Sequence, residues 1–524
     1  MGPEINADPI LALEKRIEKG LGDTIQLKRA RNSLLNISAL VPPELLGQVF
    51  RWNAIPDYGF GELEKGSYNF LLVCHHWFEV ASGTPELWTY WGNTLKLWLQ
   101  RYQRSGTAPL DLILHAQRRM GDEDVITFDR PLQDALRDRA ARDSIRSIHL
   151  RGRDTDLLDF VISLLVLGDK STRDSSIESL RLEHTSSDVS TFLTRYRFPR
   201  LRDLRLLTDA RITSWDYLKI QAPSLIALSL GFSRAPNNPT TSQLLAILAS
   251  YPNLQQLVLY ETMIPHDGGD GSTPRVRLCC LKELVLMGNY RHVFQLLDQL
   301  EYPDTLDSVH LHLSECAGES LSELLGPYLR DRVQRDGRFQ DRLGIQVSCS
   351  SGSISFSVNA FGESNIPTAL PKHGYPSMLF SAVFSDNLPR GAVEKLCSNI
   401  IAVTPRERVV RFIGGLSVHT MRDLLVAMPN VEDLYLMQSV ISDTFLRPDP
   451  LSNTKLLPSL RRLCLDYFTL QNGDGDWRPM IGYLIHQTSG DQDISLRLIH
   501  GRNTPIPPEI VGEIKGLVSE FIHQ

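Results

Sequence analysis

The stretches LRDLRL (201–206), LIALSL (225–230), LQQLVL (254–259) and LKELVL (281–286) share one pattern, with leucine at the first, fourth and sixth positions. In a strand, successive side chains alternate between faces, so the fourth and sixth positions enter a core and the residues between them face away. Related copies begin at Ile145, Ile177, Leu306, Val431 and Leu460. The four quoted copies begin 24, 29 and 27 residues apart. Repeats of roughly 20–29 residues are typical of units that each supply one strand and a return.

The segments between the strands favour helical returns. Helical patterns occur at 242–250, 292–300 and 421–428, and proline then precedes the next strand, as in YPNLQQL and MPNVEDL. Proline ends a helix and lets an extended segment follow. The chain is therefore predicted to be of the α/β class, with an irregular leucine-rich-repeat solenoid over residues 108–505.

Residues 312–405 depart from this period. A charged helical pattern is followed by IQVSCSSGSISFSVNAF (345–361), whose alternation favours strands with one wet face. We expect divergent repeats here, with Met378/Phe380 and Val410/Phe412 in degenerate strands. Over residues 506–524, Ile510, Ile514, Leu517 and Phe521 share a helical stripe. This pattern predicts a terminal helix that covers the open end of the solenoid.

The first 91 residues differ from the repeats. Residues 1–36 form a charged helical segment, for which a helix folded back on its own chain and a dimeric coiled coil are both open interpretations. Residues 37–91 predict a small helical module with large apolar side chains on its stripes. A unit of roughly 50 residues cannot bury that many alone, so we expect it to pack on neighbours or a partner.

Composition and charge exclude several classes of protein. The chain has 524 residues and a net charge of −6, and its basic residues form no long block, so we expect no nucleic-acid or membrane partner. No apolar run approaches the roughly 20 residues of a membrane helix, and the first residues lack the order of a secretory signal. The seven cysteines have no repeated short spacing, which favours reduced thiols rather than a metal site. The expected location is the cytoplasm or the nucleus.

Catalytic motifs are missing from the sequence. GLSVH (415–419) departs from a nucleophile elbow at its last position, and Ser417 is interpreted as ordinary. HDGGDG (266–271) and NGDGDW (472–477) lack the closing glutamate of a calcium loop. We therefore predict a protein that is not an enzyme and has no cofactor or metal.

The segment from Leu40 to Trp88 resembles the F-box of ubiquitin-ligase receptors, in particular the F-box-like proteins of mushroom-forming fungi. Three blocks carry the resemblance: VPPELL (41–46) with Val49 and Phe50, VCHHW (73–77) with Ala81, and TPELW (84–88). The fungal proteins also tend to have a charged helix before the box and leucine-rich repeats after it. The resemblance implies that residues 37–91 bind a Skp-type adaptor, and through it a cullin. The residues expected to form or support that contact are Pro42, Leu45, Leu46, Val49, Val73, Cys74 and Trp77.

The outward positions of the repeated strands are candidates for holding a client protein. The early rows are charged and the middle rows apolar or aromatic, and exposed aromatic and methionine side chains are enriched at interfaces. Neighbouring loops that cover these positions are the open alternative. The candidate client-binding residues are Arg181, Arg205, Tyr260, Val285, Met287 and Tyr435.

Together these features predict a substrate-recognition subunit of a Skp–cullin–F-box ubiquitin ligase. The box would bind the adaptor, and the repeats would bind a client for ubiquitination by other subunits. The alternative is a leucine-rich-repeat interaction scaffold that acts independently of a ligase. Adaptor co-purification separates the two.

Overall fold

The computed structural model describes most elements of the chain in separate stretches, with short pieces at 19–20, 22–24, 26, 189, 193–194, 327–328, 422, 425–426, 440–441 and 469–470. The longer described ranges are 41–54, 69–92, 103–115, 143–151, 175–183, 196–208, 214–232, 238–267, 275–303, 306–314, 343–350, 353–360, 378–384, 409–414, 428–437, 457–466, 477–488, 493–499 and 506–523. The chain divides into two compact units, Met1–Ser187 and Asp188–Gln524. This boundary falls inside the region predicted as one solenoid.

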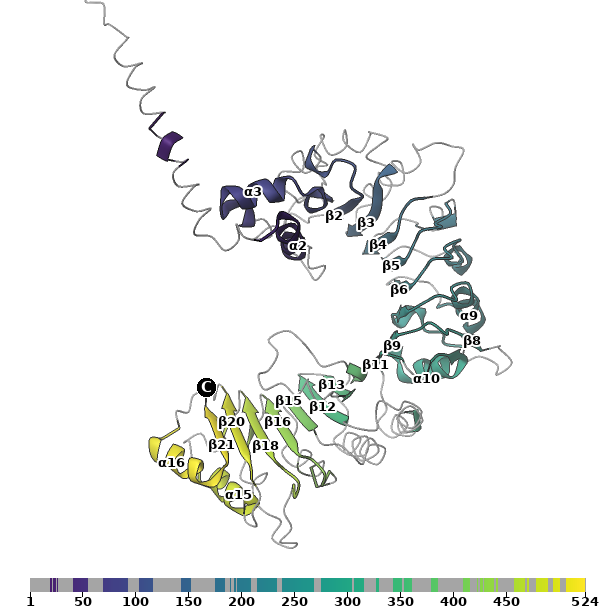
Figure 1. Cartoon of the computed structure of the whole chain (residues 1–524). Coiled ribbons are helices and arrows are strands. Elements are labelled where there is room, and N and C mark those ends of the chain that lie inside the picture. The colour runs from purple at the N-terminus through teal and green to yellow at the C-terminus, as the bar shows by residue number, and fades with distance from the viewer. Residues whose placement is uncertain are drawn as a thin grey trace, which may run out of the picture. The chain divides into compact units, whose positions relative to one another are not determined.

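Unit 1 begins with helices and continues into parallel strands (Figure 1). Strand β1 pairs with β2, β2 with β3, and β3 with β4, all in parallel. The predicted helical module and the first repeated strands therefore belong to one unit. The elements of unit 1 are α2 (Pro43–Ala54), η2 (Asn69–Leu72), α3 (His75–Ser82), η3 (Pro85–Trp88), β1 (Tyr90–Gly92), β2 (Leu110–His115), β3 (Ile145–Arg151) and β4 (Ser179–Glu183).

Unit 2 contains a large, mostly parallel sheet, and this confirms the α/β class. Its strands lie in the order β5-β6-β7-β9-β11-β14-β13-β12-β15-β16-β18-β20-β21. The strands of this sheet are β5 (Asp203–Thr208), β6 (Ala227–Phe232), β7 (Gln256–Leu259), β9 (Glu283–Asn289), β11 (Ser308–Ser314), β12 (Leu343–Ser350), β13 (Ser353–Ala360), β14 (Met378–Phe384), β15 (Val409–Gly414), β16 (Asp433–Met437), β18 (Arg462–Asp466), β20 (Ser495–Ile499) and β21 (Glu520–His523). Two separate parallel pairs are formed by β8 (Val276–Arg277) with β10 (Leu300–Glu301) and by β17 (Val440–Ile441) with β19 (Thr469–Leu470).

The leucines of the repeated pattern are buried as predicted. In β5, Leu204 and Leu206 have no exposed surface, and Leu201 just before the strand is also fully buried. The same positions of β6, β7 and β9 are at most 2 % exposed. Each fully buried leucine side chain contributes roughly 1.5–3 kcal/mol, so these rows form the core of unit 2.

Residues 312–405, which depart from the repeat period, contain the antiparallel strand pairings of the described sheet of unit 2. The chain leaves β11, skips two strand positions to form β12, and returns through β13 and β14 to the edge of β11. Strand β13 is antiparallel to both of its neighbours, and β15 then continues beside β12. The strands predicted at 345–361, at Met378/Phe380 and at Val410/Phe412 are confirmed. Their connection is a three-stranded insertion rather than a run of simple repeats.

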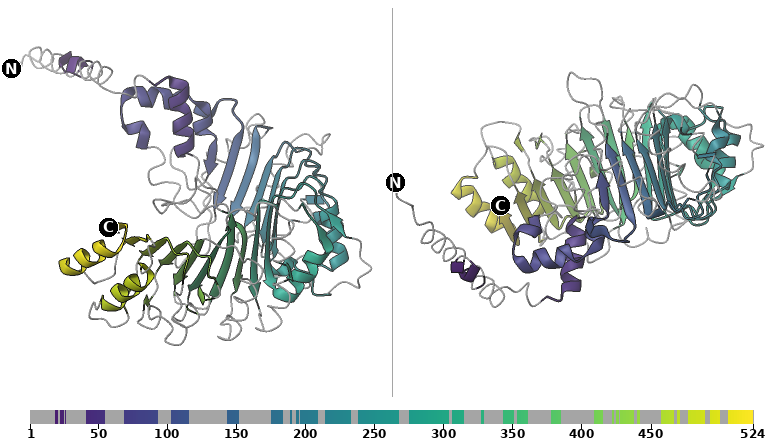
Figure 2. Two further views of the ribbon diagram at one scale, coloured as in Figure 1. Left: turned by 60° about the horizontal axis from the view of Figure 1, so that its bottom comes forward. Right: turned by 90° about the horizontal axis from the view of Figure 1, so that it is seen from above.

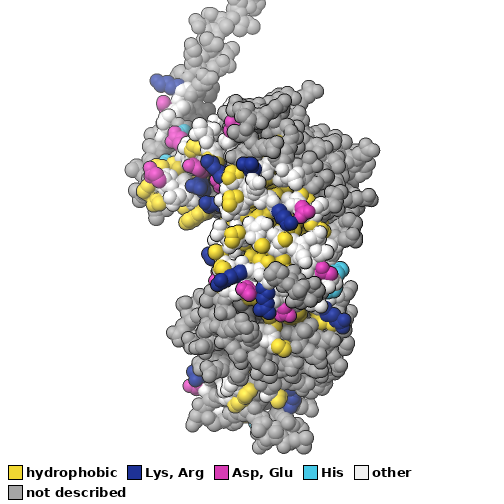
Figure 3. All heavy atoms as spheres, turned by 90° about the vertical axis from the view of Figure 1, so that its right-hand side faces the viewer, with side chains coloured by type: hydrophobic (Ala, Val, Ile, Leu, Met, Phe, Trp, Pro, Cys, Tyr) yellow, Lys and Arg dark blue, Asp and Glu magenta, His cyan; other side chains and the backbone are white. Residues whose placement is uncertain are grey.

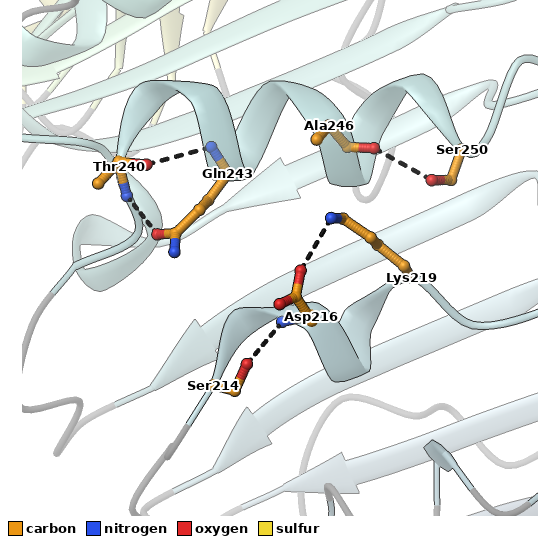
Figure 4. Close-up of polar contacts among 7 residues, drawn as sticks. All are labelled: Ser214, Asp216, Lys219, Thr240, Gln243, Ala246 and Ser250. Atoms are coloured by element: carbon orange, nitrogen blue, oxygen red, sulfur yellow. Dashed lines mark hydrogen bonds and ion pairs between the residues drawn. The ribbon is translucent and has the colours of Figure 1, made fainter.

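Helices α9 (Thr241–Ala249) and α10 (Tyr290–Gln299) connect consecutive strands of unit 2. Figure 2 shows both helices on the same side of the strands that they connect. Helix α9 begins with a capping box: Thr240 accepts a hydrogen bond from the Gln243 N–H, and the Gln243 side chain accepts one from the Thr240 N–H (Figure 4). The short helices η4 (Trp215–Leu218) and η5 (Glu261–Met263) also link strands. Ser214 caps η4, where Lys219 pairs with Asp216 at 2.8 Å.

The carboxyl-terminal part contains helices α15 (Arg478–Thr488) and α16 (Pro508–Leu517). The predicted terminal helix is shorter than expected, because it ends at Leu517. Phe521 lies in β21, where it pairs with Leu496 of β20. The sheet therefore continues past α16 to one more strand.

Little of the amino-terminal segment 1–36 lies within the described residues, and those that do, Lys19–Gly20, Gly22–Thr24 and Gln26, are helical. The coiled-coil alternative lies outside the described residues. No helix in the described part of the chain is long and apolar enough to cross a membrane.

Candidate partner-binding surfaces

The helical module of residues 41–92 has its own small core. Helix α2 begins with Pro43, where proline costs no hydrogen bond, and its stripe of Leu46 and Phe50 points inward. The ring of Phe50 stacks on that of Phe70, with the ring centers 4.5 Å apart, and lies tilted against Trp77, with the ring centers 5.1 Å apart. Phe50, Phe70 and Leu46 form a buried cluster with Ala81, Leu87 and Trp88. Two helices and two short turns thus share one apolar center.

Hydrogen bonds fix the turn that closes the module. The indole N–H of Trp88 donates to the carbonyl of Ala81 at 2.9 Å, and the Thr84 hydroxyl donates to the carbonyl of Val80 at 2.7 Å. Helix α2 packs closely here, since a Cβ at Gly47 would lie 3.2 Å from the Thr84 hydroxyl oxygen. The orientation of α2 relative to α3 is therefore set by contacts on its inner side.

The outer side of the module carries exposed apolar side chains. Leu45, Val49 and Trp52 are 51 %, 42 % and 75 % exposed, and their spacing of four and three residues places them on one stripe of α2. We call this set the α2 stripe. Leu72 and Val73, at the end of η2, are 85 % and 53 % exposed. Of the eight large hydrophobic residues exposed in the described part of the chain, six belong to this module.

One edge of this surface is partly covered. The guanidinium of Arg104 lies 5.4 Å from the ring center of Phe78 and 4.6 Å from that of Trp88. Such cation–π contacts contribute about 0.5–1 kcal/mol at exposed sites. Nearby, His75 faces Glu79 at 3.2 Å within α3. The polar edge around Phe78 contrasts with the α2 stripe.

The predicted adaptor residues separate into two groups. Pro42, Leu45, Val49 and Val73 are exposed. The other three support the module from within: Leu46 is 4 % exposed, Cys74 is half-buried before α3, and Trp77 is half-buried against Phe50.

Two exposed side chains on this surface were not predicted from the sequence. Trp52 and Leu72 are more exposed than the predicted adaptor residues Leu45, Val49 and Val73. Continuing the α2 stripe by three residues from Val49 reaches Trp52, so the helical period already contained this signal.

Arg181, the predicted client residue of unit 1, lies on the face of its strands opposite the buried leucines. It pairs in register with His149, and the next pair, Arg151 and Glu183, follows two residues on. The Glu183 carboxylate lies 3.7 Å from His149 Nε2 and 3.9 Å from Arg151 Nε. Charges of both signs therefore crowd together around Arg181.

A bidentate ion pair occurs on a strand face of each unit. Arg146 donates to Asp111 at 3.0 and 2.8 Å, and Arg462 donates to Asp433 at 2.6 Å from both nitrogens. Hydrogen bonding to the carboxylate raises the pKa of each arginine, against the opposing effect of burial. These pairs tie neighbouring strands together.

Unit 2 brings some of its predicted client residues together. Arg205 and Val285 lie in one register row that runs through Ser229 and Val258. The row continues through His310 of β11 and across β14, β13, β12 and β15 to Tyr435 of β16. Met287 faces His312 in the neighbouring row on the same side of the sheet. Burial lowers the pKa of both His310 and His312, and these two histidines were not among the predicted residues.

Three of the predicted client residues offer less surface than the alternating pattern suggested. Val285 and Tyr435 are 8 % and 9 % exposed. Tyr260 packs over Gly231, since a Cβ at that glycine would lie 2.9 Å from three side-chain atoms of Tyr260. Arg205 and Met287 are half-buried. Tyr435 lies in β16, separated from β11 by the strands β14, β13, β12 and β15.

On the side of the molecule drawn in Figure 3, positive, negative and hydrophobic side chains of the described residues are interspersed rather than gathered into a field of one sign. The described residues contain no group of three or more His, Cys, Asp or Glu that could hold a metal ion. Ser417 lies outside the described residues, while Asp267 accepts hydrogen bonds from Thr241 at the start of α9.

No protein-family model matches the chain, and no curated protein is significantly similar to it.

Proposed function

We propose that this protein is the substrate-recognition subunit of a Skp–cullin–F-box ubiquitin ligase, in which residues 37–91 bind the adaptor and the strand faces bind a client. The observation that carries the proposal is the concentration of exposed apolar side chains on the helical module. An exposed apolar group of this kind marks a protein-binding surface, and tryptophan is enriched among residues that dominate binding energy. The F-box-like motifs name the partner class.

The magnitudes support a stable contact. Burying a fully exposed leucine, valine or larger side chain is worth roughly 1.5–3 kcal/mol. The three side chains of the α2 stripe are 42–75 % exposed, so each can gain only the corresponding part of that value on binding. Part of that gain is offset by the entropy lost on association. Leu72 and Val73 add further apolar surface.

Leu45→Asp is a sharp test of adaptor binding. Leu45 lies in the first turn of α2, where a negative charge interacts favourably with the helix dipole, so the variant is expected to fold. Loss of a central contact costs about 2 kcal/mol or more, which corresponds to roughly 30-fold weaker binding. The assay is co-purification of the full chain with a Skp-type adaptor, followed by titration calorimetry.

Ile485→Asp is the matched control, because Ile485 in α15 has the same 51 % exposure as Leu45. The control should bind the adaptor like the parent. Trp77→Ala is a poorer test, since Trp77 packs against the module core and its loss would also destabilise the fold. Equal adaptor binding by parent and Leu45→Asp would show that Leu45 is not part of the contact. No adaptor binding by the parent would instead favour a scaffold that acts without a ligase.

For the client, the row from Arg205 to His310 and the pair Met287 and His312 are the surface we assign in unit 2. Met287→Glu should reduce capture of ubiquitinated proteins when proteasome activity is blocked, while adaptor binding stays unchanged. Arg277→Glu, at an exposed position of β8, is the control. The thiols of Cys74, Cys279 and Cys280 form no disulfide in the described part of the chain, which supports the proposal of a reducing compartment such as the cytosol or nucleus.

A further inference from the structure

A four-residue turn with buried ends and outward-facing middle residues leads into six strands of unit 2. In each turn the N–H of the last residue donates to the carbonyl of the first, at 3.1 to 3.4 Å. Both end residues are at most 3 % exposed in every case. The turns are Phe198–Leu201, Ala222–Leu225, Tyr251–Leu254, Leu278–Leu281, Met428–Val431 and Leu457–Leu460.

Five of these turns have proline in second place, and one does not. The prolines are Pro199, Pro223, Pro252, Pro429 and Pro458. Proline suits this place because its fixed φ matches the turn. The turn before β9 instead carries Cys279, followed by Cys280, and both cysteines are exposed free thiols. This turn therefore has two adjacent thiols where its counterparts have a proline and a polar residue.

The buried ends hold the two thiols at one place on the surface. Leu278 is fully buried and Leu281 is 2 % exposed, and the hydrogen bond between them measures 3.1 Å. Adjacent Cα atoms lie about 3.8 Å apart across a trans peptide, which is below the roughly 4.4–6.8 Å that ordinary disulfides span. A direct disulfide bond between Cys279 and Cys280 would therefore be strained. A single larger atom bonded to both sulfurs lets the two sulfurs lie farther apart and avoids this strain.

The geometry points to a chelating site for a trivalent arsenical at Cys279 and Cys280. Thiolate is the ligand that soft ions prefer. Zinc commonly takes four ligands, and the described residues offer no group of three around this turn. A monosubstituted trivalent arsenic needs only two sulfurs, because its third position keeps the organic group.

Phenylarsine oxide is a suitable probe. Its arsenic–oxygen unit reacts with the two thiols, so that both S–H bonds break and two As–S bonds form. The oxygen leaves as water with both protons, and the arsenic remains trivalent. No oxidant or reductant is consumed.

The test is intact-protein mass spectrometry of the full chain after exposure to phenylarsine oxide and then to excess monothiol. We expect a single phenylarsenic group per chain that resists the monothiol but is removed by a dithiol such as dimercaptopropanol. Cys279→Ser and Cys280→Ser should each lose the retained group, because one sulfur alone exchanges with monothiol. Cys74→Ser should keep it.

A double variant, Cys279→Pro with Cys280→Asn, guards against loss through misfolding. It rebuilds the middle of the Tyr251–Leu254 turn, which contains Pro252 and Asn253, so the parent circular dichroism and melting temperature are expected. Its retained arsenic should fall to background. Retention by this folded variant equal to the parent, or a parent adduct that monothiol removes, would overturn the assignment.

Discussion

Alanine in place of Gly231 tests how tightly Tyr260 packs over strand β6. The added Cβ would lie 2.9 Å from Cβ, Cγ and Cδ2 of Tyr260, whereas carbon atoms prefer about 3.5–4.0 Å. Rotation of the ring brings no relief, because the tyrosine Cβ itself is one of the three atoms. The backbone is also fixed, since the Tyr260 N–H donates to Leu230 at 2.9 Å and its carbonyl accepts from Met263 at 2.7 Å.

Overpacking of this kind costs about 1–3 kcal/mol, so we expect Gly231→Ala to lower the free energy of unfolding by about 2 kcal/mol. The assay is urea denaturation of the full chain, followed by circular dichroism. Gly482→Ala is the control: its Cβ meets nothing within 4 Å in helix α15, so it should be neutral or stabilise by about 0.5–1 kcal/mol. Tyr260→Gly in the Gly231→Ala background removes the opposing Cβ, so the two changes should couple strongly. A Gly231→Ala protein as stable as the parent would refute the packing argument.

Three further predictions concern buried polar groups. Tyr251→Phe should destabilise the fold by about 1–3 kcal/mol in urea denaturation. The reason is that the Tyr251 hydroxyl donates to the Leu218 carbonyl and accepts from the Ile220 N–H at 3.2 Å. An unchanged stability would mean that water replaces both hydrogen bonds. Arg462→Ala should leave the buried Asp433 carboxylate without its bidentate partner. The loss of stability should be below the roughly 3–5 kcal/mol of a fully buried pair, because Arg462 is 40 % exposed. Asp433→Asn in the Arg462→Ala background should recover part of the lost stability. Burial lowers the pKa of His310 and His312, so the stability they contribute is complete above a pH of about 6.5 and is lost as pH falls through their lower folded values. Urea midpoints between about pH 7.5 and pH 5 should fall less steeply for His310→Gln/His312→Gln, and an unchanged slope would contradict this origin.

Much of the strand structure of unit 2 could be predicted from the sequence, because burial of a row of leucines leaves a direct trace in the pattern. Leu204 and Leu206 illustrate this: both are fully buried, with the polar Arg205 between them half-buried. The α/β class followed from strands alternating with helical returns. The terminal helix was too long in prediction, since Phe521 fits a helical stripe and a strand equally well.

The direction of a strand leaves no such trace. The alternation at 345–361 predicted strands but could not distinguish parallel from antiparallel, since a period of two reads the same in both directions. The inverted β13 and the skipped positions before β12 follow from two pairings between strands separated along the chain, that of β14 with β11 and that of β12 with β15. Likewise, the alternation within their own strands did not indicate that Val285 and Tyr435 are only 8 % and 9 % exposed.

In helix α2 of the helical module, too, the sequence predicted the helix but not which of its apolar side chains face inward. Leu45 and Leu46 are adjacent and equally apolar, yet one is 51 % and the other 4 % exposed. Neighbouring helical residues point about 100° apart, so only one of the two can face the core. The sequence identified both as important but could not assign the inner and outer roles.

The exposure of the α2 stripe is not a packing defect that the module could correct by rotating α2. The helix lies close to Thr84 only because Gly47 carries no side chain, with a Cβ there already at 3.2 Å from the hydroxyl oxygen. A rotation that buried Leu45 would bring a larger side chain to that contact and expose Leu46 and Phe50, whose rings and methyl groups fill the core. The module thus has one favourable orientation of α2, and that orientation leaves Leu45, Val49 and Trp52 on the outside. Water contact at these positions is costly for an isolated module, which is the physical reason to expect a protein partner there.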